Sequence, residues 1–266
     1  MLHRKPTLDD GSAVITGLLL GMNLPSNLPV GIVILGAVVA IGIGKMTFGG
    51  LGCNLFNPAL VGRCMLLVSF PVQMTSWPVV GQQMNYTDAT TGATPLSLMK
   101  KAISSGDASV LDSMPSSLHL LLGNNVNGGA GTIGEVCALA LLLGLAFMLW
   151  KKIITWHIPV SIILSAFVFA SVLHIANPIY ADPISVVLTG GMMLGAIFMA
   201  TDYTTSPMTR RGQLIYGTAI GLLTIVIRNW GAYPEGMSFA ILIMNAFTPL
   251  INNYCKPKRF GEVLKK

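Results

Sequence analysis

Charged residues are scarce in this sequence. Only 10% of the 266 residues are Asp, Glu, Lys or Arg, whereas soluble domains carry about 25%. Hydrophobic residues make up 53% of the chain, and the mean hydropathy is +0.69. This composition excludes an ordinary soluble fold and predicts a single integral membrane domain over residues 1–266.

Cysteines are also few, and they are scattered. The four cysteines form no CxxC pair, and no Cys/His cluster has the spacing of a zinc site. An iron–sulfur cluster held by this chain alone would need four closely placed thiolates, so we expect no metal site. Basic residues form no stripe interleaved with aromatic residues, so nucleic-acid binding is not expected. The polar start of the chain predicts no cleaved signal peptide.

Long apolar runs, in contrast, are abundant. A membrane-spanning helix needs about 20 mostly apolar residues, and eight segments approach this length, which predicts an all-α polytopic helical bundle. The segments are about 12–24, 29–45, 53–70, 132–150, 158–175, 184–201, 212–229 and 237–253. Proline removes a helix donor, so the third segment is expected to break near Asn57 and Pro58.

The basic residues assign the sides of the membrane, because cytoplasmic loops carry an excess of Lys and Arg. Threading the chain through eight segments puts most of its 16 basic residues on one side. These are Arg4, Lys5, Lys45, Lys151, Lys152, Arg210, Arg211, Lys256, Lys258, Arg259, Lys265 and Lys266. We therefore expect both termini in the cytoplasm and the long polar loop of residues 71–131 on the outside.

The sharpest local pattern lies in this external loop, at residues 88–95 (DATTGATP). Thr94 suits a helix N-cap and Pro95 the first helical position. The predicted helix runs to Lys100 and Lys101, whose charges suit a helix C-terminus. A capped turn alone would explain these residues. Alternatively, the Thr94 hydroxyl is a site for phosphate esterification, because a helix N-terminus favours an anion, and Asp88 assists a modifying enzyme or its metal.

A faint internal repeat is also present. Residues 16–21 (TGLLLG) resemble residues 189–195 (TGGMMLG), and each stretch precedes a second span, a glycine-rich turn and a third segment. The third segments hold Asn57 and Asn245 at matching places, where their amides are expected to satisfy backbone groups freed by helix breaks. The copies run in opposite senses, as in transporters built on inverted repeats with paired broken helices. Chance similarity between Gly/Leu-rich spans is the alternative.

Several motifs together resemble one family. The pattern Asp88-x-x-Thr91-Gly92-Ala93-Thr94 is similar to the motif at which flavin transferases join FMN, through its phosphate, to the last threonine. Residues 48–59 (FGGLGCNLFNPA), 198–207 (FMATDYTTSP) and 233–237 (YPEGM) resemble the same family. This family is the RnfD component of the Rnf electron-transport complex, close kin to the NqrB component of the sodium-pumping NADH:quinone reductase. The resemblance covers nearly the whole chain, and its later motifs favour the Rnf member.

The resemblance implies a flavin-carrying subunit of an ion-translocating oxidoreductase complex in the bacterial inner membrane, inactive alone. The complex would pass electrons between ferredoxin and NAD and couple this to transport of Na+ or H+. FMN would be attached covalently to Thr94, and a second, non-covalent flavin (riboflavin) is a further expectation by analogy. The alternatives are the quinone-reducing relative and a non-redox small-solute channel of inverted-repeat architecture, which would have no use for the flavin motif.

The resemblance also implies partners and a longer architecture. The partners are a flavin transferase, membrane iron–sulfur subunits, an external flavin subunit, and cytoplasmic subunits that carry the NAD and ferredoxin sites. Members of the family resemble ten-span proteins, whereas eight segments are found here. The missing pair is expected at the amino terminus.

Three charged residues in or near the spans are further candidates. Arg63 lies inside the third segment, where a buried arginine needs a partner. It is expected either to approach the flavin ring or phosphate, or to pair with a carboxylate. Glu135 and Asp202 lie near the outer and inner ends of their segments, where each belongs either to an ion path or to the interface.

Overall fold

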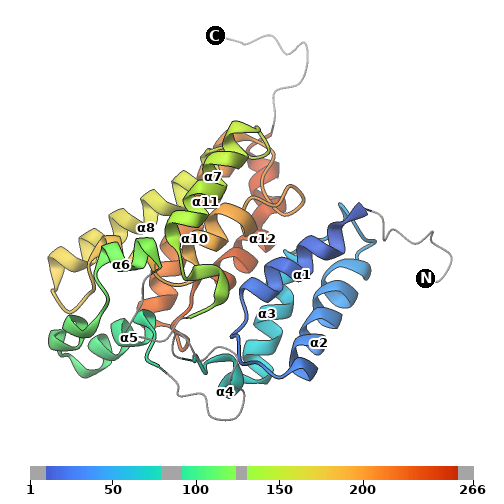
Figure 1. The fold of residues 1–266 in the computed structure, drawn as a ribbon. Helices are drawn as coiled ribbons and strands as arrows, with labels where there is room; N and C mark the ends of the chain where they lie inside the picture. Colours follow the sequence, from blue (N-terminus) through green and yellow to red (C-terminus); the bar gives the residue numbers. More distant parts are fainter. Residues whose placement is uncertain (1–9, 79–91, 124–130, 257–266) are drawn as a thin grey trace, which may run out of the picture.

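The computed structural model describes residues 10–78, 92–123 and 131–256 (Figure 1). Its helical elements are α1 (Ser12–Met22), α2 (Val30–Val38), η2 (Val39–Met46), α3 (Pro58–Ser69), α4 (Pro71–Met74), α5 (Pro95–Ser105), η3 (Ala108–Ser113), α6 (Ser117–Leu122), η4 (Ile133–Glu135), α7 (Ala138–Trp150), α8 (His157–Ala176), α9 (Pro183–Leu188), α10 (Met192–Leu194), η5 (Gly195–Met199), α11 (Arg210–Trp230) and α12 (Met237–Tyr254). These ranges contain no strand beyond an isolated bridge. The all-α prediction is confirmed for them.

The segment predicted over residues 53–70 differs from expectation. Residues 47–57 form turns and loop, and α3 begins only at Pro58. Proline therefore starts this helix instead of breaking it, as its fixed φ and missing N–H allow at the first helical position. The Asn57 amide oxygen caps the helix, accepting hydrogen bonds from Ala59 N at 3.1 Å and Leu60 N at 3.4 Å. The expected mid-helix break was wrong, but the predicted role of the Asn57 amide is confirmed.

The break instead occurs in the segment predicted over residues 184–201. Helix α9 ends at Leu188, α10 begins at Met192, and Gly190 between them has φ +69°. This left-handed conformation costs a residue with a side chain about 1–2 kcal/mol, whereas glycine adopts it freely. Helix α12, which was expected to break near Asn245, runs unbroken to Tyr254.

Small residues let the helices approach closely. Helices α8 and α11 are the most extensively packed pair, and a Cβ added at Gly221 of α11 would lie 2.6 Å from the Ile162 carbonyl oxygen of α8. A Cβ at Gly62 of α3 would lie 2.8 Å from the Gly36 carbonyl oxygen of α2. Such contacts between small residues are typical of helix packing in membranes, where backbone proximity takes the place of a hydrophobic driving force.

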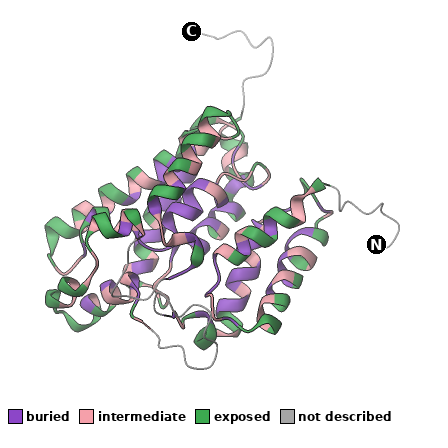
Figure 2. Cartoon of the chain, viewed as in Figure 1, coloured by how far each residue is buried: buried purple, intermediate pink, exposed green. Residues whose placement is uncertain are grey.

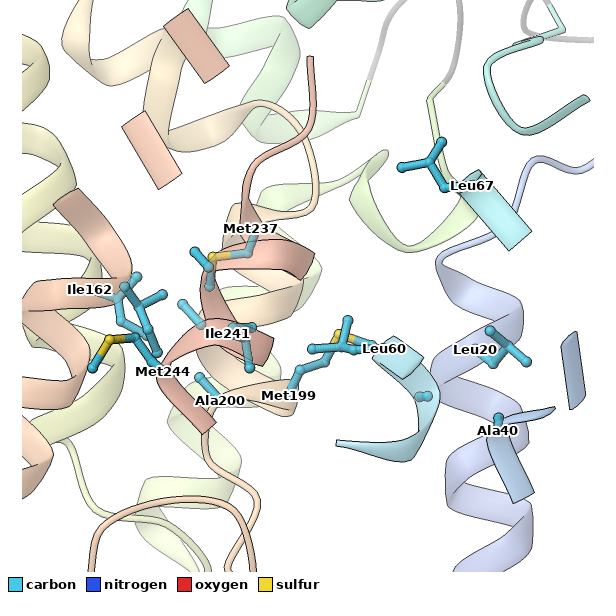
Figure 3. Close-up of a cluster of buried hydrophobic side chains, with 14 of the residues drawn as sticks. Leu20, Ala40, Leu60, Leu67, Ile162, Met199, Ala200, Met237, Ile241 and Met244 are labelled. Atoms are coloured by element: carbon cyan, nitrogen blue, oxygen red, sulfur yellow. The ribbon is translucent and has the colours of Figure 1, made fainter. Parts of the chain in front are cut away.

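The main core joins α1 and α3 to α12. Figure 3 shows Leu60 of α3 beside Met199, with Leu20 of α1 on its other side and Ile241 of α12 nearby. These residues belong to one buried cluster. The amino-terminal and carboxy-terminal helices therefore share a continuous core.

Many large apolar residues are exposed, and Figure 2 shows exposed residues along the helices of the bundle. Examples are Val14, Leu143 and Ile175, which are 74%, 64% and 83% exposed. Such surface is unfavourable in water and natural against lipid tails. By length and hydropathy only α8, among the helices of the described ranges, is fit to cross a membrane alone, and the apolar helices Ser12–Met22, Val30–Met46, Pro58–Ser69 and Ala138–Trp150 are shorter. The count of eight spans remains a prediction.

The two ends of the bundle carry different elements. Helices α4 and α5 lie at the lower end in Figure 1, whereas α1 begins and α12 ends near the upper end. The turn between α11 and α12 belongs to the lower end, because Lys100 of α5 contacts its backbone at Gly231 and Ala232. Most of the candidate site residues gather at this lower end.

Candidate functional site

Thr94 caps helix α5 as predicted. Its φ and ψ are −74° and 154°, and its hydroxyl oxygen accepts a hydrogen bond from Ser97 N at 3.2 Å. Pro95 occupies the first helical position. The helix continues to Ser105, beyond the expected end, so Lys100 and Lys101 do not lie in its last turn. Their predicted role at the helix C-terminus was wrong, because Gly106, with φ +70°, ends the helix instead.

The flavin-motif residues are only partly described. Asp88 and Thr91 lie outside the described residues. Gly92 donates its N–H to the Trp77 carbonyl oxygen at 2.9 Å, and Ala93 is exposed. The contact brings the residues just before Thr94 next to the segment that follows α4.

Thr94 lines a small cavity that also includes two other predicted residues, Arg63 and Glu135. The cavity volume is about 20 Å³, which is room for about one water molecule. The lining residues are Arg63, Leu67, Met74, Thr75, Trp77, Thr94, Leu96, Glu135, Tyr233, Pro234 and Glu235. This cavity therefore brings together Arg63 of the third predicted segment, Glu135 of the fourth and Thr94 of the predicted external loop.

Arg63 is buried and contacts residues near both ends of the chain, at the end of α1 and in α12. Its Nη1 donates to Asn23 Oδ1 at 2.8 Å and to Ser238 Oγ at 2.9 Å, and its Nη2 pairs with the Glu235 carboxylate. The Nε of Arg63 has no hydrogen-bond partner within the part of the chain that the structure describes. The expectation that Arg63 pairs with a carboxylate is confirmed, and its guanidinium also borders the Thr94 cavity.

Glu135 lies on another wall of the cavity. Its Oε1 accepts a hydrogen bond from Thr132 N at 3.0 Å. Its Oε2 is buried and finds no partner in the described ranges. Glu135 and Glu235 therefore both contribute carboxylates to the lining of the cavity that Arg63 borders.

Asp202 lies away from this cavity. Its Oδ2 accepts hydrogen bonds from Thr204 Oγ1 at 2.9 Å, Thr205 Oγ1 at 3.2 Å and Asn54 Nδ2 at 3.4 Å. It precedes α11, whereas Glu235 follows it. The 21 residues of α11 span about 30 Å, so the structure does not bring Asp202 to Thr94.

The two asparagines of the faint repeat meet in the core. Asn57 Nδ2 donates to the Met199 carbonyl oxygen at 3.1 Å. In the amide orientation that satisfies both of its ends, the Asn245 oxygen accepts from Asn57 N at 3.1 Å, while its nitrogen donates to Ile241 O and Tyr216 Oη. Asn245 thus serves the backbone at the start of α3, not a break in its own helix.

Sequence reasoning missed three features of the site. Glu235 stood out only as part of a motif, although so few acidic residues lie near the spans that it was a natural partner for Arg63. Arg228 was not recognised as buried; its Nη1 donates to Val186 O at 2.7 Å and its Nη2 to Thr189 O at 2.9 Å. The break at Gly190 had a local signal in the Gly190-Gly191 pair, which was assigned to a span.

Comparison with known proteins places the sequence among redox membrane proteins. Residues 1–261 match the family described as NQR2, RnfD, RnfE. The D subunit of the Na(+)-translocating ferredoxin:NAD(+) oxidoreductase complex of Acetobacterium woodii is 47% identical over 261 residues, covering 98% of this chain and 76% of that protein.

Two further relatives carry similar names. The D subunit of the proton-translocating ferredoxin:NAD(+) oxidoreductase complex of Clostridium ljungdahlii is 41% identical over 262 residues, covering 98% of this chain and 78% of that protein. The D subunit of the ion-translocating oxidoreductase complex of Klebsiella pneumoniae is 40% identical over 282 residues, covering 98% and 81%. The resemblance predicted from the motifs agrees with these matches.

Proposed function

The chain belongs to the NQR2, RnfD, RnfE family, and on this premise we propose that it is the RnfD-type component of an ion-translocating ferredoxin:NAD+ oxidoreductase complex. The named relatives support this choice over the quinone-reducing alternative, because they are components of ferredoxin:NAD(+) oxidoreductases. Those two relatives are named for different ions, Na+ and the proton, so either ion fits the proposal. A simple solute channel is disfavoured by the same matches.

The proposed electron carrier is FMN joined to Thr94. The observation that carries this part is the placement of the Thr94 hydroxyl at the N-terminus of an 11-residue helix, lining a cavity with the buried Arg63 guanidinium. Both groups favour a phosphate ester, and Arg63 Nε is a buried donor without a partner in the described residues. The helix N-terminus and Arg63 thus favour the phosphate of FMN, whereas the carboxylates of Glu135 and Glu235, which line the same cavity, oppose an added anion.

The chain's own residues have distinct roles in this proposal. Arg63 stabilises negative charge next to Thr94, and the Glu235 carboxylate fixes the orientation of its guanidinium. Trp77 and Tyr233 contribute aromatic surface to the cavity wall. FMN, when bound, supplies the redox chemistry, whereas the protein sets its position and electrostatics. A second, non-covalent flavin such as riboflavin is part of the proposal by family analogy.

The membrane architecture is also proposed. It consists of about eight spans related by an inverted repeat, with cytoplasmic termini and the 71–131 loop outside. The grouping of α4, α5 and the α11–α12 turn at one end of the bundle supports this arrangement. Glu135 and Asp202 would then lie at opposite ends of an ion path. The other subunits of the complex would supply the iron–sulfur, ferredoxin and NAD sites.

A flavin-transfer experiment tests the Thr94 assignment. The full chain is expressed with a flavin transferase, and the protein band is examined for in-gel flavin fluorescence. We expect fluorescence from the wild type and none from Thr94→Val. Thr75→Val is the matched control, because Thr75 lines the same cavity but lies outside the motif. Fluorescence that survives Thr94→Val would contradict the assignment.

A further inference from the structure

The hydroxyl of Thr94 is closed off in this structure. Thr94 is only 6% exposed, and its hydroxyl oxygen already accepts the Ser97 N–H. The cavity beside it has room for about one water molecule. Esterification forms a bond from Thr94 Oγ1 to phosphorus and breaks the phosphoanhydride of a flavin dinucleotide. The nucleotide monophosphate then leaves, and the hydroxyl proton is released. A phosphoryl donor of this size cannot reach the oxygen in the observed arrangement.

The side chain of Lys100 links α5 to the α11–α12 turn. The Lys100 ammonium donates to the carbonyl oxygens of Gly231 at 2.5 Å and Ala232 at 2.7 Å. Gly231 is the C-cap of α11. The last carbonyls of a helix lack intrahelical donors and carry partial negative charge. Lys100 therefore satisfies both the hydrogen-bonding and the electrostatic need of that helix end.

The apolar contact of α5 is small. Leu96 and Met99 form a buried cluster with Ala181, against which the partly buried Leu111, Met114 and Val186 pack, whereas the main core contains 20 buried residues. Leu96 fits against the bare backbone of Gly190, where an added Cβ would lie 2.5 Å from Leu96 Cδ1. An element with few buried apolar contacts opens at lower free energy than the core. Helix α5 is thus suited to detach without unfolding of the bundle.

We propose that Lys100 is a positioning residue that holds α5 on the α11–α12 turn, and that Thr94 is modified only when α5 leaves this turn. The inference rests on the proposed function for its biological meaning, because it concerns access to the same hydroxyl. Its structural part, the closing of position 94 by the Lys100 contact, is testable without any flavin.

The first experiment measures access to position 94 by a thiol reagent. Thr94→Cys is introduced into the full chain after its four native cysteines are replaced, and the maleimide labelling rate is followed in detergent. Lys100→Gln should raise the rate about tenfold, because it removes a charge-assisted hydrogen-bonding group. Labelling reports the open population when opening and closing are fast.

Three matched variants distinguish a specific role of Lys100 in holding α5 from a general destabilisation of the protein. Lys101→Gln changes the exposed neighbour on the same helix and should leave the rate unchanged. Lys100→Arg keeps a cationic donor and should keep the labelling slow. Leu96→Ala weakens the apolar contact and should raise the rate by an independent route. Equal rates for wild type, Lys100→Gln and Leu96→Ala would overturn the inference.

The second experiment measures flavin incorporation with Thr94 intact. Lys100→Gln should reach the same final fluorescence as the wild type but several-fold faster, with Lys101→Gln as the control. Equal incorporation rates would overturn the inference and leave the Thr94 assignment standing. Absence of flavin from every variant, together with faster thiol labelling in Lys100→Gln, would instead refute the proposed function and retain the role of Lys100.

Discussion

Two buried arginines are held in different ways. Arg63 of α3 contacts side chains, namely those of Asn23, Ser238 and Glu235. Arg228 of α11 donates its hydrogen bonds to backbone carbonyls, at Val186 and Thr189. The first arrangement joins residues from the start and the end of the chain. The second closes the carboxy-terminal end of α9 beside the break at Gly190.

The difference indicates different roles for the same charge. The partners of Arg63 are side chains that substitutions can remove, and one of them is an anion, so this site depends on matched charges. The partners of Arg228 belong to the backbone, and they need a donor wherever α9 ends. We infer that Arg63 connects α1 and α3 to α12, and that Arg228 stabilises the break between α9 and α10 at Gly190.

The largest expected effect is that of Arg63→Leu. This change leaves the Glu235 carboxylate, 12% exposed, without its cationic partner. Breaking a buried ion pair from one side costs about 3–5 kcal/mol. Thermal unfolding of the purified protein in detergent should show this loss. The double variant Arg63→Leu/Glu235→Leu should recover much of it, and a double variant no better than the single one would contradict the charge-matching argument.

A smaller effect is expected for Arg228→Leu. It removes two charge-assisted hydrogen bonds but leaves no directly paired anion among the described residues, so we expect a loss of about 2–3 kcal/mol. The same unfolding measurement applies. If this loss equals or exceeds that of Arg63→Leu, the proposed distinction between the two sites is wrong.

The smallest expected effect is the difference in unfolding free energy between two glycine variants, which tests the break at Gly190 alone. Gly190→Ala places a Cβ 2.7 Å from Arg228 Nη2, at φ +69°. Gly11→Ala is the matched control, because Gly11 has φ +66° with nothing within 4 Å of the added Cβ. Both changes incur backbone strain of about 1–2 kcal/mol. Only Gly190→Ala adds steric overlap, which costs about 1 kcal/mol or more. If the two variants have equal unfolding free energies, close packing is not required at the break.

The sequence predicted the helices better than their interruptions. Apolar runs located every major helix of the described ranges, and the cap at Thr94 followed from one threonine and one proline. The break was assigned to Pro58 because proline is the strongest local signal, yet proline at the first helical position begins a helix. The true interruption at Gly190 depends on Arg228 and Leu96, which are distant in sequence. Tertiary contacts decided where the chain bends.

Tertiary contacts also decided which residues form the candidate site. Thr94, Arg63 and Glu135 were each recognisable as unusual for their local surroundings, but nothing in the sequence indicated that they share one cavity. Their convergence requires α3, η4 and α5 to meet at one end of the bundle. Glu235 could have been paired with Arg63 from charge scarcity alone, whereas the carbonyl partners of Arg228 carry no sequence signal.

The hydrogen bond from Arg63 to Ser238 joins residues 175 positions apart. At about 5–20 residues per second, a ribosome needs roughly ten to thirty seconds to synthesise that stretch. During this interval α3 and Asn23 have been made, but Glu235, which neutralises the guanidinium, and Ser238, which accepts its hydrogen bond, have not. An unpaired arginine is costly at the membrane centre, so α3 has reason to stay near the interface until α12 arrives. The order of synthesis thus delays completion of the Thr94 cavity until the residues at the start of α12 have been made.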